Sequence, residues 1–124
     1  MSRIIIRKMR ESDLEAASEL AMLANPHAVK EKYVKHILAE LKANPNLSFV
    51  VADDGNIVGY VQADVHGEEA VIEDIAVAKE YQGKGIGKRL LERELKTLKG
   101  KGVKMVFAEV HHKCASAIPF YYKH

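Results

Sequence analysis

Three apolar, β-branched segments follow one another between Leu47 and Val77, and only two short turns separate them. The first turn, 53–56, reads Asp-Asp-Gly-Asn, and Gly and Asn tolerate the positive φ angles that a tight hairpin requires. The second turn, 66–69, is equally short. Parallel strands need a connection of a dozen or more residues, so these strands can pair only antiparallel. The sequence therefore predicts an antiparallel meander of strands at 47–52, 57–65 and 70–77.

Helical patterns flank this meander. After a strand at 3–9, Ser12 and Glu15 form an S-x-x-E capping box that predicts a helix start, and this helix is expected to end at Asn25. Pro26 is expected in the first turn of a second helix. The remaining expected elements are a helix from the glycine-rich stretch at 82–87 to about Lys99, a strand at 104–110 and a short helix at 115–123. The order β-α-α-β-β-β-α-β-α predicts one domain over 1–124 with α/β mixed (α+β) architecture, a central, mostly antiparallel sheet flanked by helices.

The composition is that of an ordinary globular domain. The 124 residues, of which 48% are hydrophobic and 29% charged, suit one domain with its own core. A net charge of +2 favours neither nucleic acid nor a membrane as a partner, and no apolar stretch approaches the roughly 20 residues of a membrane-spanning helix. Cys114 is the only cysteine, which excludes an internal disulfide and indicates a reducing, cytoplasmic setting.

Gly83, Gly85 and Gly87 alternate directly before the third predicted helix. Glycines let a ligand approach the backbone closely, and a helix N-terminus presents unpaired N–H groups and the positive end of the helix dipole. Three basic side chains add charge at the same end: Lys84, Lys88 and Arg89. The arrangement predicts an anion site, most naturally for a diphosphate. The alternative is a glycine-rich turn with a solvated basic face.

Three nucleotide-binding motifs can be compared with this loop. A P-loop, G-x-x-x-x-G-K-[ST], is excluded because Gln82 stands five residues before Gly87 and Lys88 is followed by Arg89. A Rossmann fingerprint, G-x-G-x-x-G in a parallel βαβ unit, is excluded by the glycine spacing and by the meander. Gln82-x-x-Gly85-x-Gly87 instead resembles the Q/R-x-x-G-x-G/A motif of the GNAT acetyltransferases, whose loop wraps the pyrophosphate of coenzyme A.

The resemblance covers about residues 3–124. Residues 73–77, 81–87 and 90–91 resemble the family's fourth strand, loop and third helix, and residues 109–110 and 117–121 resemble its fifth strand and fourth helix. This implies an N-acetyltransferase that transfers acetyl from acetyl-CoA to a primary amine by direct attack in a ternary complex. The acceptor is a small-molecule or protein amine. The coenzyme-binding residues that the resemblance implies, the first three through their backbone, are Ile75, Ala76, Val77, Gln82, Gly83, Lys84, Gly85, Ile86, Gly87, Lys88 and Cys114.

Glu73 is the candidate general base, which takes the proton from the attacking ammonium. The alternation of side chains along a strand places it on the face of Ile75 and Val77, with Asp74 on the opposite face. In several members of the resembled family a glutamate on this strand is the base. The alternative is that Glu73 lies at the mouth of the cleft or binds a substrate ammonium. Two further candidates for the base are Asp64 and His111.

Tyr121 is the candidate general acid for the leaving thiolate. It matches the tyrosine of the family's F-Y-x-x-x-G-F pattern, and a phenol stays protonated near neutral pH. The alternative is an aromatic packing residue, which is the role expected for Phe120. Tyr122 is the neighbouring phenol to compare with it.

The chain departs from the family pattern at two places. Cys114 stands where the family often has an asparagine that helps to hold coenzyme A, and no base is evident that would make this thiol a nucleophile. The chain ends at His124, before the family's Gly-Phe and two further strands, so the strand at 104–110 is expected at a sheet edge. A shortened chain, a homodimer through that edge and a non-catalytic coenzyme A-binding or interaction module all fit this departure.

No metal site is expected from the sequence. His111 and His112 are adjacent on a strand, so their side chains point to opposite faces and cannot easily share one ion. His27 and His36 lie nine residues apart, and no cysteine or acidic cluster was found in the sequence to join them.

Overall fold

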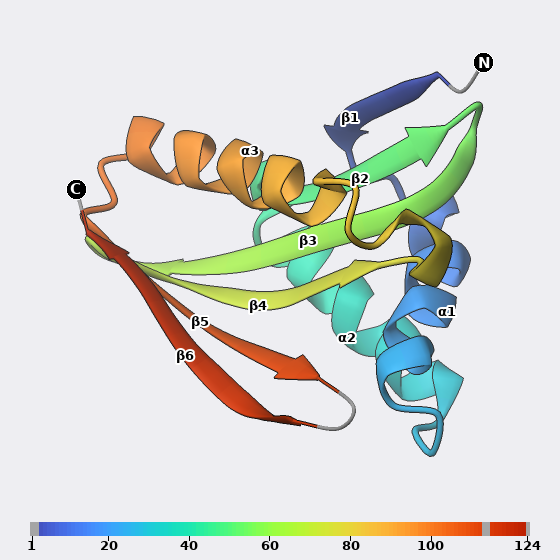
Figure 1. Ribbon diagram of the computed structural model, residues 1–124. Helices are drawn as coiled ribbons and strands as arrows, with labels where there is room; N and C mark the ends of the chain where they lie inside the picture. Colours follow the sequence, from blue (N-terminus) through green and yellow to red (C-terminus); the bar gives the residue numbers. More distant parts are fainter. Residues whose placement is uncertain (1–2, 113–114, 124) are drawn as a thin grey trace.

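The computed structural model describes residues 3–112 and 115–123, and for Ala24 and residues 109–123 it describes the backbone alone. Six strands form one sheet in the order β1-β2-β3-β4-β5-β6 (Figure 1). The strands are β1 Ile4–Lys8, β2 Ser48–Asp53, β3 Asn56–His66, β4 Glu69–Val77, β5 Met105–His112 and β6 Ala115–Lys123. Neighbouring strands pair antiparallel, except that β4 and β5 are parallel. The predicted meander and the mixed α/β architecture are thereby confirmed.

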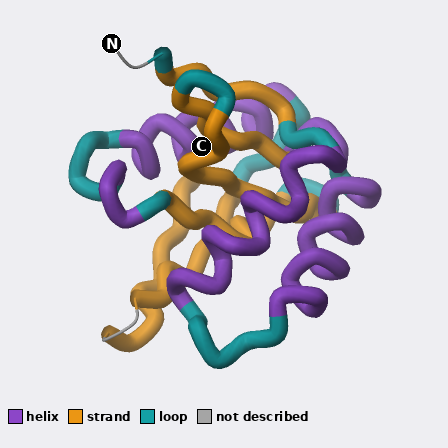
Figure 2. Tube along the Cα trace, turned by 90° about the vertical axis from the view of Figure 1, so that its right-hand side faces the viewer, coloured by secondary structure: helices purple, strands orange, loops and turns teal. Residues whose placement is uncertain are grey.

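Helices cover both faces of this sheet. They are α1 Leu14–Ala24, α2 Lys30–Ala43 and α3 Ile86–Gly100, with the short 3₁₀ helices η1 Glu11–Asp13, η2 Pro45–Leu47 and η3 Lys79–Tyr81. α3 connects the parallel strands β4 and β5 and packs on one face (Figure 1). α1 and α2 lie side by side on the other face (Figure 2). In the described part of the chain, none of the helices has the length and apolar character needed to cross a membrane.

An apolar core lies on each face of the sheet. Along β2, Phe49 and Val51 contact the core beneath α3, whereas Val50 contacts the core beneath α1 and α2. Leu90 of α3 and Ile37 of α2 are both fully buried in these cores. Complete burial of one such side chain stabilises the fold by about 1.5–3 kcal/mol, so each helix is held mainly by its apolar stripe.

A β-bulge interrupts β4 at Glu73. Gln62 of β3 pairs with Asp74, and the next residue, Ala63, pairs with Ile72, so Glu73 is the extra residue of β4. A bulge turns two successive side chains to the same side of the sheet. Ile72 before the bulge and Ile75 after it both contact the α3 core, which leaves Glu73 and Asp74 on the α1/α2 face. The predicted alternation, with Glu73 on the face of Ile75, is therefore wrong.

The start of α1 also differs from the prediction. The helix begins at Leu14, and the carboxylate of Asp13 accepts a hydrogen bond from the Arg10 backbone N–H at 2.8 Å and two more from the Arg7 guanidinium. The Ser12–Glu15 capping box is not found among the hydrogen bonds of these described residues. The buried carboxylate of Asp13 instead binds the Arg10 N–H at the start of η1, and Asp13, the N-cap of α1, makes no side-chain cap hydrogen bond to α1.

Two further expectations about helices are corrected by the backbone. Pro26 lies in the turn that follows α1, and α2 begins only at Lys30. Residues 115–123, expected as a helix, form β6, which pairs with β5 from Met105↔Lys123 onward. The segment is rich in aromatic residues, which favour strands, and Pro119 breaks a helix interior but is tolerated in an edge strand. β5 is therefore an inner strand, contrary to the expectation that it forms the sheet edge.

Candidate active site

The glycine loop lies between the end of β4 and the start of α3. Gly83 and Gly85 have φ angles of 78° and 81°, which L side chains rarely adopt. A Cβ atom added at either position would meet nothing within 4 Å, so the space beside this backbone is open. The loop is exposed from Gln82 to Gly85. The glycines thus serve both the left-handed turn and access to the backbone.

The first turn of α3 has unpaired N–H groups. The first hydrogen bond of the helix runs from the Arg89 N–H to the Gly85 carbonyl at 3.0 Å, so the N–H groups of the preceding helical residues have no acceptor within the helix. Gly85 is the N-cap and supplies no side-chain cap. Lys84 and Lys88 are exposed beside this end. Together these groups favour a bound anion such as a phosphate.

Side chains and backbone hold this loop against the sheet. The side-chain N–H of Gln82 donates to the Val77 carbonyl at 3.0 Å, and the Tyr81 hydroxyl donates to the carboxylate of Asp53. Asp53 is only 6% exposed, and its hydrogen bond raises the pKa of Tyr81, with burial adding to the effect. The Lys84 ammonium lies 5.6 Å from the centre of the Tyr81 ring. The loop is thereby preorganised, and the Gln82 side chain braces it.

β4 and β5 separate beside the loop. Their parallel pairs run from Glu69↔Met105 to Ile72↔Ala108, where the bulge begins. Beyond this point Ile75 and Ala76 pair with β3, and in the described register β5 does not pair with them. Figure 1 shows the two strands diverging there. In the described register, the edge of β4 that faces β5 is therefore unpaired at Ile75 and Ala76, within the segment 75–77 that the family resemblance implies for coenzyme binding.

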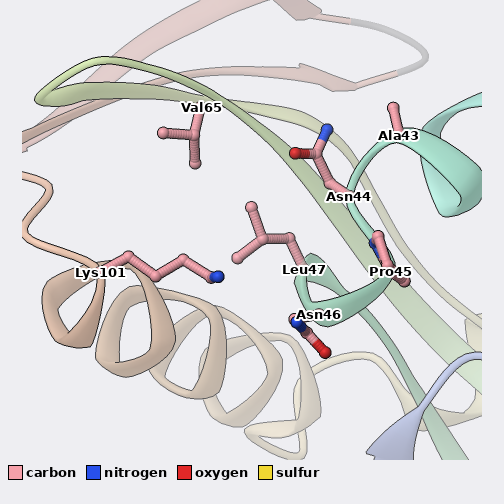
Figure 3. Close-up of a pocket in the computed structure, with 7 residues that line it drawn as sticks. All are labelled: Ala43, Asn44, Pro45, Asn46, Leu47, Val65 and Lys101. Carbon is pink, nitrogen blue, oxygen red and sulfur yellow. The ribbon is translucent and has the colours of Figure 1, made fainter.

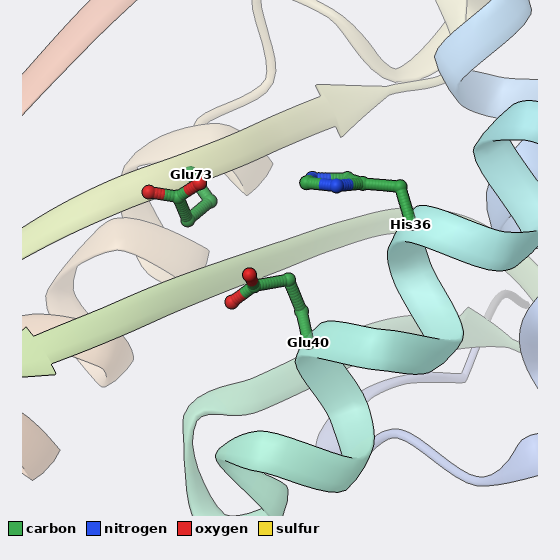
Figure 4. A group of neighbouring side chains, drawn as sticks. All are labelled: His36, Glu40 and Glu73. Atoms are coloured by element: carbon green, nitrogen blue, oxygen red, sulfur yellow. The ribbon is translucent and has the colours of Figure 1, made fainter.

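The Glu73 side chain faces α2, which packs on the same face of the sheet. Its carboxylate lies with the side chains of His36 and Glu40, and one donor atom from each falls within 4.8 Å of the others (Figure 4). Glu73 is exposed, and the described residues form no hydrogen bond or ion pair with its carboxylate. The neighbouring Asp74, by contrast, accepts a hydrogen bond from the Tyr60 hydroxyl. Burial and the charge of Asp74 raise the pKa of Tyr60 far above its usual value, so this phenol stays protonated.

The surroundings of Glu73 are acidic. Burial of Glu40, and then the charges of Asp64 and Glu73, raise the pKa of Glu40. Asp64, a further candidate for the base, accepts a hydrogen bond from the Asn44 amide at 2.9 Å and lies 3.3 Å from the His66 imidazole. Its carboxylate is therefore engaged in local structure.

Three of the predicted site residues contribute no described side chain to the loop site. The Ile86 side chain is 3% exposed and packs in the α3 core, so only its backbone N–H is available at the loop. Tyr121 lies in β6 opposite Phe107, and its side chain lies outside the described part of the structure. Cys114 lies outside the described residues.

A separate pocket of about 210 Å³ lies near the opposite end of α3 (Figure 3). Its lining residues are Ala43, Asn44, Pro45, Asn46, Leu47, Val65 and Lys101. Lys101 follows the C-terminal end of α3, whereas the glycine loop precedes the N-terminal end, so this pocket is not part of the loop site.

The sequence analysis missed two groups of residues at the site. Asp53 was interpreted only as a turn residue, although it anchors Tyr81. His36 and Glu40 were not connected with Glu73, because α2 and β4 meet only through the tertiary structure. The spacing of His36 and Glu40, one helical turn apart, was the one local signal.

Comparison with known proteins places the chain in a family. Residues 14–124 match the model of the Acetyltransferase (GNAT) family. The chain is 29% identical over 116 residues to the [ribosomal protein bS18]-alanine N-acetyltransferase of Escherichia coli, covering 94% of this chain and 76% of that protein. It is 29% identical over 138 residues to the spermidine N(1)-acetyltransferase of Thermoplasma acidophilum, covering 97% and 86% respectively.

A solved structure extends the likeness to the whole domain. The PaiA N-acetyltransferase of Thermoplasma acidophilum, solved in complex with coenzyme A, matches with a TM-score of 0.77 over 98% of this chain and 99% of that one. At 21% identity this likeness shows a shared fold. The family match over residues 14–124 and the glycine loop before α3 agree, and the chain belongs to the GNAT family of acetyltransferases.

Proposed function

We propose that this protein is an N-acetyltransferase that transfers the acetyl group of acetyl-CoA to a primary amine by direct attack in a ternary complex. The observation that carries the proposal is the loop before α3, where Gly83 and Gly85 leave open space beside uncapped N–H groups. Those N–H groups would bind the pyrophosphate, with Lys84 and Lys88 supplying positive charge. The PaiA protein of Thermoplasma acidophilum, whose fold is similar to that of this chain, was solved in complex with coenzyme A, which supports this ligand.

The pantetheine arm would lie where β4 and β5 separate. The free edge of β4 offers the backbone groups of residues 75–77 to the arm and to the thioester oxygen. Backbone donors suit an oxygen that becomes anionic, because they are fixed before the reaction starts. The hydrogen bond from the Gln82 side chain to the Val77 carbonyl links the glycine loop to the end of β4, and so would fix the position of the start of α3 relative to this edge.

The chemical step needs one base and one acid. The acceptor's ammonium loses a proton to Glu73, directly or through a water molecule, and the neutral nitrogen then attacks the thioester carbon. A C–N bond forms, the C–S bond breaks, and the Tyr121 hydroxyl donates a proton to the leaving thiolate. The exposure of Glu73 and the absence of a bonded partner for it among the described residues support its role as base.

The acceptor belongs to the class of amines. One relative is named for an alanine of ribosomal protein bS18 and another for spermidine, so related chains act on a protein and on a small polyamine. The carboxylates of Glu40, Asp64 and Glu73 give the α2 side of the site a negative character that suits a cationic acceptor.

A pair of glycine variants tests the proposal. Gly85→Ala places a Cβ in the open space of the loop, and Gly102→Ala places one beyond the other end of α3, where φ is 82° and nothing lies within 4 Å. Both changes force alanine into the left-handed region, at a similar cost of about 1–2 kcal/mol in stability. Release of free thiol from acetyl-CoA is then measured with a panel of amines. The KM for acetyl-CoA should rise at least tenfold in Gly85→Ala and stay near that of the wild type in Gly102→Ala.

The outcomes separate the possible functions. Turnover in the wild type with the expected contrast between the two variants supports the enzyme. Binding of acetyl-CoA without turnover of any amine would indicate a non-catalytic coenzyme A-binding module. Equal kinetic effects of the two variants would contradict the assignment of the loop.

A further inference from the structure

Three side chains from two separate segments converge beside the bulge of β4. His36 and Glu40 are one turn apart on α2, so they project from the same face of the helix. Glu73 reaches them from β4 because the bulge turns it to the α1/α2 face. Figure 4 shows the imidazole and the two carboxylates directed into a common space, and one donor atom of each lies within 4.8 Å of the other two.

The two carboxylates of this cluster lack a neutralising partner. Among the described residues no lysine or arginine forms an ion pair with Glu40 or Glu73. The Oε2 atom of Glu40 is buried and has no hydrogen-bond partner in the same part of the structure. A buried carboxylate oxygen without a donor is costly, and a bound cation would satisfy it.

We propose that His36, Glu40 and Glu73 bind a divalent transition-metal ion, with Zn²⁺ as the best match. Imidazole nitrogen and carboxylate oxygen are both ligands of Zn²⁺ in proteins, whereas Ca²⁺ and Mg²⁺ prefer oxygen ligands alone. Bond lengths of about 2.0–2.2 Å place the donor atoms of a tetrahedral zinc site roughly 3.4 Å apart. His36 and Glu73 are exposed, and rotation of these two side chains would have to bring the three donors from their present separation, within 4.8 Å, to this distance. The fourth position is open to water.

The site has a consequence for catalysis, and this consequence, unlike the metal site, rests on the proposed function. A carboxylate that coordinates a metal ion cannot also accept the proton of an ammonium. Zn²⁺ in the site would therefore inhibit acetyl transfer by occupying Glu73, and a chelator would restore the activity. The cluster would then be a regulatory site next to the reacting groups.

Cobalt binding tests the site without reference to activity. The purified, chelator-treated full chain is titrated with Co²⁺, whose visible absorption is strong when it is bound in a four-coordinate site. The wild type should bind one Co²⁺, which Zn²⁺ displaces. His36→Ala and Glu73→Gln should each weaken binding at least tenfold. His27→Ala removes an exposed histidine outside the cluster and serves as the matched control, in which binding should be unchanged.

To test whether histidines near the C-terminus bind the Co²⁺, the titration is repeated with His111, His112 and His124 replaced by alanine. Thermal unfolding in chelator checks that each variant folds. No Co²⁺ binding by the wild type, or equal binding by the wild type and His36→Ala, would overturn the metal site. If a diamine raises the Tm in a His36-dependent way while Co²⁺ does not bind, the cluster is an ammonium site and the proposal is wrong. If the chelator-treated, metal-free wild type acetylates no amine although it binds Co²⁺ as expected, the result would count against the proposed function alone.

Discussion

Glu73 and Asp74 are adjacent in β4, and both side chains lie on the α1/α2 face of the sheet because a β-bulge falls at Glu73. The two carboxylates have different surroundings. Asp74 accepts a hydrogen bond from the buried Tyr60 hydroxyl, whereas Glu73 is exposed and faces His36 and Glu40. The bulge also marks the point where β4 ceases to pair with β5, so Glu73 lies at the opening of the proposed cleft.

This relationship predicts different effects of two isosteric substitutions. Glu73→Gln removes the proposed base and should lower kcat at least 100-fold, with the Kd for acetyl-CoA unchanged. Asp74→Asn keeps an oxygen for Tyr60 and should change kcat less than about threefold. Steady-state rates at saturating acetyl-CoA, measured in the presence of a chelator, compare the two. A larger loss of kcat in Asp74→Asn would show that the base has been assigned to the wrong carboxylate.

The hydrogen bond from the Tyr81 hydroxyl to the Asp53 carboxylate indicates that Tyr81 helps to hold the glycine loop in place. Tyr81→Phe removes the donor and leaves the buried Asp53 carboxylate without it, which should lower the free energy of unfolding. Because Tyr81 directly precedes the loop, the Kd for acetyl-CoA should rise several-fold. Tyr33→Phe, a change in α2 on the other face of the sheet, is the control. Denaturant unfolding and calorimetric titration provide the two measurements, and an unchanged Kd would count against loop preorganisation.

The buried carboxyl group of Glu94 should make the stability of the protein depend on pH. This residue of α3 is 0% exposed, both of its carboxylate oxygens lack a partner among the described residues, and burial raises its pKa to about 9. The folded state thus keeps a proton that the unfolded state releases above pH 4.5, so stability falls as the pH rises from about 4.5 to about 9. The slope from this one group is about 1.4 kcal/mol per pH unit.

Glu94→Gln should remove this slope, because the amide stays neutral, and should raise the free energy of unfolding at pH 8 by at least about 1 kcal/mol. Glu92→Gln, an exposed site on the same helix, should leave the slope unchanged. Urea unfolding at several pH values measures both variants. An identical pH dependence in Glu94→Gln and the wild type would show that the buried carboxyl is ionised in the folded protein.

Local patterns were sufficient for much of this fold. The Asp-Asp-Gly-Asn turn at 53–56 and the apolar stripe of α3, which includes Leu90 and Leu98, depend on neighbours in sequence, and both were predicted correctly. The glycine loop belongs to the same class, since positive φ at Gly83 and Gly85 is a backbone property of those residues. The family resemblance followed from these local features and is confirmed by the match over 14–124.

Other features depend on tertiary register, which the sequence analysis did not contain. The bulge at Glu73 arises from how β4 pairs with β3, and it inverts the faces expected for Glu73 and Asp74. Residues 115–123 were predicted to form a short helix, but in the structure they pair with β5. Glu94 has a polar side chain on the apolar stripe of α3 and was not predicted to be buried.

Thermal unfolding of the purified protein with and without acetyl-CoA tests the central claim most directly. A ligand that binds only the folded state, at about 100 times its Kd, adds about 2.7 kcal/mol to stability, which is several degrees in Tm for a domain of this size. We predict such a rise for the wild type and for Gly102→Ala, and a much smaller one for Gly85→Ala. A cooperative transition in the wild type that acetyl-CoA does not shift would contradict the assignment of the glycine loop as the coenzyme site.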